Sequence, residues 1–228
     1  MHYVLDFADL RQYLMLFVRG AALTIALTAV STVVGVIVGA LCAVAREEGP
    51  RWLKAIAGLY VELIRNTPFI VQLFFIFFGL PSLGIHVDET TAAIVAMSVN
   101  LGAYATEIIR AGMRAVPNGL SEAGLSLAMT RAQILRHVIL PQAFAKVFPA
   151  LASQIVIVML GSAVVSQISV PDLSYAANFV QSRTFRAFES YLIVTALYLM
   201  LAIALRRVLM RCARRLFRGT VKVRGGAR

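Results

Sequence analysis

Charged side chains recur at helical spacing inside two otherwise apolar segments. Glu62 and Arg65 lie three residues apart in one segment, and Glu107 and Arg110 repeat that spacing in another. Residues three apart share a helix face, so each pair can form an ion pair, and Arg65 and Glu107 can also pair across the segments. Charge within a membrane segment is costly unless it faces protein or water. We interpret the four residues as structural ties near one end of the segments or as part of a gate.

No nucleophile–base pair or metal-ligand spacing accompanies these charges. Cys42 and Cys212 lack a neighbouring cysteine at CxxC spacing, and the three histidines are scattered. We therefore expect no catalytic residue and no bound metal, which argues against an intramembrane enzyme.

The elements that carry these residues are membrane segments. The 228 residues are 60% hydrophobic and 14% charged, against about 45–50% and about 25% in soluble domains. Soluble enzymes, disordered chains and secreted disulfide scaffolds are thereby excluded. Five stretches are long enough to cross a bilayer. We predict an all-α membrane protein whose single domain, residues 1–228, has spans at about 20–44, 55–80, 90–109, 147–170 and 187–205.

Three details of these spans carry structural predictions. Ser31, Gly35 and Gly39 recur every fourth residue, which favours close packing of another helix. Pro68 removes a backbone donor, so a kink or break is expected near Asn66, and we group both residues with the gate or structural set. Before the first span, Phe7, Leu10, Leu14 and Phe17 have helical spacing, which fits a short helix in the membrane interface or a frayed start of the span.

Basic residues set the expected orientation. The connections after spans one, three and five carry 3, 5 and 9 Lys or Arg residues, whereas those on the other side carry 2, 0 and 2. The positive-inside rule then places the N-terminus outside and the C-terminus in the cytoplasm. The basic tail, residues 206–228, contains no acid, and its expected partner is anionic membrane lipid rather than nucleic acid.

The long polar connection over about residues 114–141 suggests an ordered helix. Ser121 is a plausible N-cap, with Glu122 in the first turn. Gly124 and Ala128 lie four apart and leave one face nearly bare, and Pro141 marks the start of the next helix. Such a helix can dock in a groove of another protein, or it can lie on the bilayer surface.

This connection resembles the EAA loop of ABC-importer permeases, whose pattern is E-A-A, three residues, G, nine residues, I, any residue, L-P. Gly124 replaces the second alanine, Ala128 replaces the glycine and Val138 replaces the isoleucine. The change at Ala128 adds a methyl group where close approach is expected. The resemblance implies that an ATP-binding subunit contacts Ser121, Glu122, Ala123, Gly124, Ala128, Leu140 and Pro141.

Three further stretches narrow the resemblance to one subfamily of these permeases. Residues 60–81 are similar to the second-span signature of polar-amino-acid permeases, residues 103–113 to the run before their coupling loop, and residues 18–27 to their opening. The sequence is thereby identified as a type I importer permease of the histidine, arginine, glutamine and glutamate class in the bacterial cytoplasmic membrane.

The resemblance implies an assembly. Two permease chains, identical or different, form the pathway, an ATP-binding subunit dimer docks on the coupling loops, and an external solute-binding protein delivers one amino acid. The chain lacks a G-x-x-x-x-G-K-[ST] loop. We therefore expect it to bind no cofactor and to hydrolyse no ATP, with ATP and Mg²⁺ held by the partner subunit. Closure of that dimer would switch the pathway as a rigid body.

A zwitterionic amino acid needs partners for its ammonium and its carboxylate. Helix-to-helix hydrogen bonding is the alternative role for the polar residues of the spans. Some relatives carry charge in the region of 154–161, where this chain has none, which argues against a site for a cationic side chain or suggests that the partner permease holds the substrate. The candidate substrate residues are Asn100, Tyr104, Gln154, Ser162, Ser166 and Gln167.

A different function class, a stand-alone secondary transporter or channel, is the alternative. Inverted or parallel repeats would favour it, and none is evident within the five spans. Uptake by the chain alone, driven by an ion gradient, would distinguish it.

Overall fold

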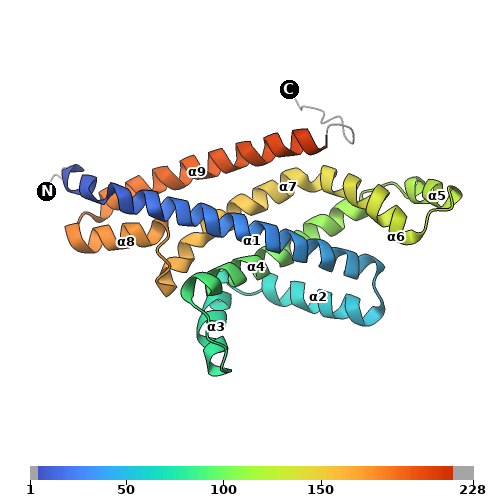
Figure 1. The fold of residues 1–228 in the computed structure, drawn as a ribbon, viewed down its shortest axis with the longest axis horizontal. Helices are drawn as coiled ribbons and strands as arrows, with labels where there is room; N and C mark the ends of the chain where they lie inside the picture. Colours follow the sequence, from blue (N-terminus) through green and yellow to red (C-terminus); the bar gives the residue numbers. More distant parts are fainter. Residues whose placement is uncertain (1–4, 218–228) are drawn as a thin grey trace.

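The structure is a computed structural model that describes residues 5–217, and the regular elements of this part of the chain are all helices (Figure 1). It contains α-helices joined by short turns, with two 3₁₀-helices, η1 and η3, and one π-helical turn, η2. In chain order the elements are η1 (Ala8–Tyr13), α1 (Leu14–Glu48), α2 (Arg51–Arg65), α3 (Phe69–Ser82), α4 (Glu89–Arg114), α5 (Asn118–Ser126), α6 (Arg131–Ile134), η2 (Leu135–Ile139), α7 (Leu140–Gly161), η3 (Ser162–Ile168), α8 (Leu173–Thr184) and α9 (Ala187–Leu216).

The described residues contain four helical stretches long and apolar enough to cross a membrane: Asp9–Glu48, Glu89–Arg114, Arg131–Ile168 and Ala187–Leu216. A fifth crossing results if α2 and α3 are counted as one bent span. In Figure 1 α1, α4, α7 and α9 run side by side, with α8 near the N-terminus and α5 at the opposite end. We call these two ends the α8 end and the α5 end.

Small residues bring α1 and α4 together, as the stripe on α1 predicts. Ser31, Gly35 and Gly39 are buried, and the Ser31 hydroxyl donates to the carbonyl of Ile94 at 3.4 Å. A Cβ atom on Gly35 would lie 2.9 Å from Leu101. Close packing of this stripe against another helix is therefore confirmed, and α4 is the partner.

The break predicted near Asn66 is also confirmed, because α2 ends at Arg65 and α3 departs at 108°. Side chains bond the carbonyl groups that the helix end leaves open. The amides of Asn66 and Gln72 donate to Glu62 O at 2.8 Å and to Ile64 O at 2.7 Å, and the Thr67 hydroxyl donates to Leu63 O at 2.9 Å. Backbone polar groups at membrane depth are thus satisfied within the protein.

The first described turns pack against the α8 end. Leu10 and Phe17 are buried in a cluster with residues of α8 and α9, whereas Leu14 is 68% exposed. Among residues 5–217, η1 leads directly into α1, and the apolar helical stretch Asp9–Glu48 includes residues of both. Of the two interpretations of this region, the one that makes it the start of the span agrees with the structure.

A buried carboxylate joins three helices at the α8 end. Asp172 is the N-cap of α8; its carboxylate accepts from the backbone N–H of Tyr175 at 2.8 Å and from the hydroxyl of Tyr198 on α9 at 3.0 Å. The next amide, of Leu173, donates to the Thr24 hydroxyl on α1 at 3.3 Å. Burial outweighs these hydrogen bonds and raises the pKa of Asp172 to about 6.

The basic tail falls only partly within the described residues. Its first half forms the last turns of α9, where Arg206, Arg207, Arg211, Arg214 and Arg215 are exposed. Residues 218–228 lie outside the described part of the chain.

Candidate functional site

Three of the predicted substrate residues share one cavity. Asn100 and Tyr104 come from α4 and Gln154 from α7, beside the break between α2 and α3. The cavity has a volume of about 380 Å³, and no charged side chain of residues 5–217 lines it. We call it the Asn100 cavity; its other lining residues are Thr67, Pro68, Phe69, Met97, Ile157, Val158 and Gly161.

Asn100 is held in place by a residue that the sequence analysis missed. Its side-chain amide donates to the Gln72 carbonyl oxygen at 3.0 Å, and the Gln72 amide donates in turn to Ile64 O and Thr67 O. Gln72 therefore connects the Asn100 cavity to the helix break. The only sequence signal was one amide within the apolar run of α3.

The other three predicted substrate residues do not line this cavity. The hydroxyls of Ser162 and Ser166 donate to carbonyl groups three residues earlier, at 2.8 Å each, and Gln167 is exposed elsewhere on η3. The reason is the change from α-helix to 3₁₀-helix at Ser162, which alters the face that each later side chain occupies. The grouping of all six residues is corrected accordingly.

A second cavity adjoins the first on its α5 side. We call it the Glu62 cavity; it has a volume of about 460 Å³ and polar walls that include Glu62 and Arg65 of α2 and the following residue, Asn66. Tyr104 lines both cavities, and the Arg65 guanidinium lies 5.3 Å from the centre of its ring. Tyr104 therefore separates an uncharged cavity from a charged one.

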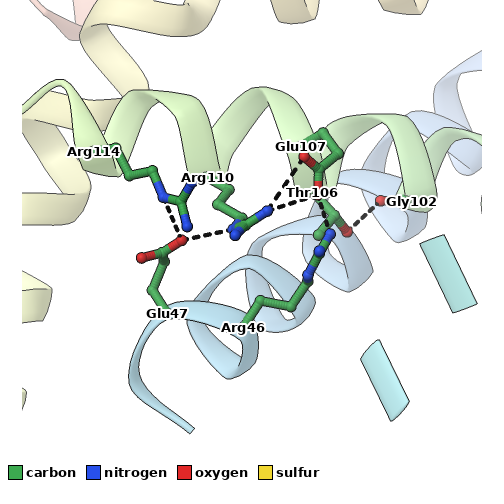
Figure 2. A network of polar contacts seen from close by, with 7 residues as sticks. All are labelled: Arg46, Glu47, Gly102, Thr106, Glu107, Arg110 and Arg114. Carbon is green, nitrogen blue, oxygen red and sulfur yellow. Dashed lines mark hydrogen bonds and ion pairs between the residues drawn. The ribbon is translucent and has the colours of Figure 1, made fainter. Parts of the chain in front are cut away.

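An ion-pair network fastens α1 to α4 at the α5 end (Figure 2). Arg46 pairs with Glu107, while Glu47 accepts from Arg110 at 2.6 Å and from Arg114 at 2.8 Å. The predicted pair within α4 also forms, with Arg110 and Glu107 3.4 Å apart. The sequence analysis missed Arg46 and Glu47 because it assigned them to a loop, whereas α1 continues to Glu48.

The proposed pairing of Arg65 with Glu107 is wrong. Arg46 and Arg110 occupy the Glu107 carboxylate, and Arg65 stacks on Tyr104 instead. Among the described residues, Glu62 and Arg65 make no ion pair with each other. Spacing alone permitted these pairs, but spatially closer partners from α1 decided which of them formed.

The helix of the coupling loop begins earlier than expected. Its N-cap is Pro117 rather than Ser121, so Glu122 lies beyond the first turn. Proline fixes φ near the helical value and lacks an amide hydrogen that the first turn would leave unbonded, which makes it a favourable helix start. The expected roles of Ser121 as N-cap and Glu122 as a first-turn acid are therefore corrected.

The expected bare face is filled by the chain itself. A Cβ atom on Gly124 would lie 2.8 Å from Ile134, so this glycine admits α6 rather than another protein. Ala128 lies beyond the end of α5 with φ of 58°. That conformation is strained for a residue with a side chain. The left-handed backbone conformation at the end of α5 therefore explains why the family pattern has glycine at this position. The Ala128 methyl group blocks no close approach within the chain.

What α5 presents outward is a different set of side chains. Leu125 and Leu127 are 57% and 76% exposed, and Glu122 and Ala123 are exposed beside them. Two large apolar side chains exposed this close together are a feature of surfaces that contact another protein. We call these four residues the α5 surface.

Pro141 lies in the first turn of α7, which begins at Leu140, so its predicted position at a helix start is confirmed. The preceding π-helical turn over Leu135–Ile139 leads into α7 without a break, and helical structure is continuous from Arg131 to Ile168. Proline cannot donate to the carbonyl four residues earlier, and a wider turn accommodates this missing bond. The helix α6, against which α5 packs, is thus connected to α7 through one continuous helical run.

Comparison with known proteins gives consistent matches. A family model described as binding-protein-dependent transport system inner membrane component matches residues 35–218. The chain is 32% identical over 202 residues to an arginine transport system permease protein of Bacillus subtilis, covering 88% of this chain and 92% of that protein. It is 32% identical over 213 residues to a glutamine transport system permease protein of Escherichia coli, covering 92% and 97%. A crystal structure of an amino acid ABC transporter with histidines matches with a TM-score of 0.84 and 38% identity, covering 93% of this chain and 100% of its own.

Proposed function

The chain belongs to the family of binding-protein-dependent transport system inner membrane components as a permease subunit of a bacterial amino-acid ABC importer, and we propose that α5 is where the ATP-binding subunit docks. Such a permease crosses the inner membrane several times and works with ATP-binding subunits and another permease. ATP hydrolysis lies in those separate subunits, so this chain is not itself the enzyme.

The α5 surface is the observation that carries the docking proposal. Leu127 is 76% exposed, although the opposite side of α5 is packed against Ile134 through Gly124. A helix that is held rigidly on one side and apolar on the other suits transmission of force from a partner. The continuous run from Arg131 through α7 would carry that displacement to Gln154 at the Asn100 cavity.

The orientation of the chain follows from the same proposal. The α5 end carries the ion-pair network, the start of α2 and the basic end of α9, and a cytoplasmic position satisfies the positive-inside rule. The α8 end and the N-terminus then face outward, where an external solute-binding protein would deliver the amino acid.

We propose that the Asn100 cavity holds the amino acid in transit. Asn100, Tyr104 and Gln154 offer hydrogen-bonding groups within an otherwise apolar wall. Of the cargoes named for the two relatives, glutamine suits a lining without charge better than arginine. Closure of the ATP-binding dimer would drive the two permeases between states open to opposite sides.

The docking proposal is tested with Leu127→Glu in the complete transporter, reconstituted in liposomes with its ATP-binding subunits and solute-binding protein. Burying a carboxylate in an apolar contact is unfavourable, so we expect ATP-driven uptake of radiolabelled L-glutamine and L-arginine to fall at least tenfold. The matched control is Leu216→Glu at the end of α9, where the side chain is 72% exposed. Unchanged uptake by Leu127→Glu would contradict the docking role.

A further inference from the structure

The Glu62 cavity contains two charged side chains that the ion-pair network leaves available. Arg46 and Glu107 pair with each other, and Glu107 is also 3.4 Å from Arg110. Within residues 5–217, by contrast, no ion pair engages the Glu62 carboxylate or the Arg65 guanidinium. Both side chains are exposed on α2 and line the same cavity.

These two groups lie on the route between the Asn100 cavity and the α5 end. Tyr104 lines both cavities, and Arg65 lies against its ring at the boundary. Glu62 is one helical turn before Arg65, nearer the start of α2 and therefore nearer the α5 end. A solute that leaves the Asn100 cavity toward that end passes Tyr104 and meets Arg65, then Glu62.

The chemistry of this pair matches the part that all amino acids share. Every amino acid in transit carries an ammonium and a carboxylate, and each forms its strongest hydrogen bonds with a group of opposite charge. The Arg65 guanidinium can donate two hydrogen bonds to a carboxylate in bidentate geometry, and the Glu62 carboxylate can accept hydrogen bonds from the ammonium. The uncharged Asn100 cavity offers neither opposite charge.

We propose that Glu62 and Arg65 form a second, transient binding site for the backbone zwitterion of the transported amino acid, on the α5 side of Tyr104. The inference rests on the proposed transport through the Asn100 cavity. The site binds the backbone and not the side chain, so it contributes to the transfer rate and not to the choice of cargo. The contact with Tyr104 holds the Arg65 guanidinium at the boundary when no carboxylate is present.

The first test measures uptake of radiolabelled L-glutamine by the complete reconstituted transporter. We expect Glu62→Gln and Arg65→Gln each to lower the uptake rate about tenfold, while receptor-stimulated ATP hydrolysis stays within twofold. Matched controls are Glu48→Gln at the end of α1 and Arg51→Gln at the start of α2, which are exposed and do not line the cavity. Both controls are expected to transport within twofold of the wild type.

The second test measures equilibrium binding of L-glutamine to the nucleotide-free complex in an Asn100→Ala background, which weakens the first cavity. The remaining binding should be displaced by L-alanine, which carries both backbone charges, but not by propionate or ethylamine, which carry one each. Arg65→Gln should abolish this binding, whereas Arg65→Lys should retain at least part of it, because the positive charge remains. A purely structural role of Arg65 would not produce this pattern of competition.

The outcomes separate this inference from the function on which it rests. Absence of ATP-dependent uptake by the wild-type complex with either L-glutamine or L-arginine would contradict the proposed function itself. Normal wild-type uptake, together with unchanged uptake in both variants, would overturn only the second site. Loss of the permease dimer in Arg65→Gln, measured by size-exclusion chromatography, would instead identify Arg65 as a contact between subunits and would also overturn the proposal.

Discussion

The two ends of the helical bundle are held together by different chemistry. At the α5 end, α1 and α4 are joined by ion pairs whose side chains remain 19–59% exposed. At the α8 end, α1, α8 and α9 meet around Asp172, which is fully buried and bonded to neutral partners. Two ion pairs also lie at that end and share Arg186, which is 3.3 Å from Asp6 near the surface and 3.8 Å from the buried Glu189.

The difference indicates which end can move. Ion pairs with access to water contribute about 0–1 kcal/mol each and exchange readily with solvent. Breaking a buried hydrogen bond leaves a polar group unsatisfied and costs about 1–3 kcal/mol. We therefore expect the polar contacts of the α5 end, where we propose that the ATP-binding subunit acts, to break at a lower cost than those around Asp172 at the α8 end.

Removal of the buried carboxylate should have the largest effect on stability. Asp172→Ala removes an N-cap, worth about 1 kcal/mol, and deprives the Tyr198 hydroxyl of its buried carboxylate acceptor, leaving it only the contact with Ser174 at 3.0 Å, so we expect a loss of about 2–3 kcal/mol. The measurement is chemical denaturation in detergent micelles at pH 5, where the folded carboxyl group is largely protonated. Asp9→Ala, at an exposed carboxylate of η1, is the control, and an equal loss in both variants would remove the contrast between buried and exposed acids.

The same carboxyl group should make stability depend on pH. Its pKa is about 6 in the folded protein, against about 3.9 in an unfolded chain. The folded state therefore binds the extra proton between pH 4 and 6, and its free energy of unfolding should fall by about 2.5 kcal/mol as the pH rises through this window. Asp172→Asn should remove that component of the pH dependence; an identical profile in the variant would show that Asp172 does not titrate as stated.

Loss of the Glu107 carboxylate should have a smaller effect that depends on salt. Glu107→Gln removes the ion pairs with Arg46 and Arg110, and we expect a loss of about 1 kcal/mol at low ionic strength that shrinks in 1 M NaCl. Glu48→Gln, at the exposed acid that follows Glu47 in α1, should change stability by less than about 0.5 kcal/mol. A large loss that persists in high salt would mean that the α5 end is held as firmly as the α8 end.

A substitution at the end of α5 should have the smallest effect on stability, and it should increase stability rather than decrease it. Ala128→Gly relieves the left-handed conformation at φ of 58°, and we expect a gain of about 0.5–1 kcal/mol. Ala123→Gly, in the helical part of α5, should destabilise by about the same amount. Hydrogen exchange of the α5 amides measures both changes, and slower exchange for Ala123→Gly than for Ala128→Gly would contradict the assignment of strain to Ala128.

The sequence predicted features that depend on a single element. The small-residue stripe of α1 required a close helix, and Pro68 required a break, because each effect arises from the residue's own backbone and size. Partners set by three-dimensional packing were not predictable. Gly124 suggested an external groove, but Ile134 filled the space, and Gln72 and Asp172 gave no sign that they connect helices distant in sequence.

The start of α5 was missed for a local reason. Ser121 and Pro117 both favour a helix start, and the periodicity of so short a helix does not distinguish them. The error changes the face assigned to each residue, so the outward position of Leu125 and Leu127 became evident only in the structure.

Cysteine cross-linking tests the central claim, that the α5 surface contacts the ATP-binding subunit, most directly. Leu127→Cys is introduced into a chain in which Cys42 and Cys212 are replaced by serine. A series of single cysteines is placed on the ATP-binding subunit. Each complete transporter is then treated with a short bifunctional thiol reagent. Docking at the α5 surface predicts a covalent product between the two subunits from Leu127→Cys and none from Leu216→Cys. A Leu127→Cys side chain that forms no adduct with the ATP-binding subunit in an actively transporting complex would contradict it.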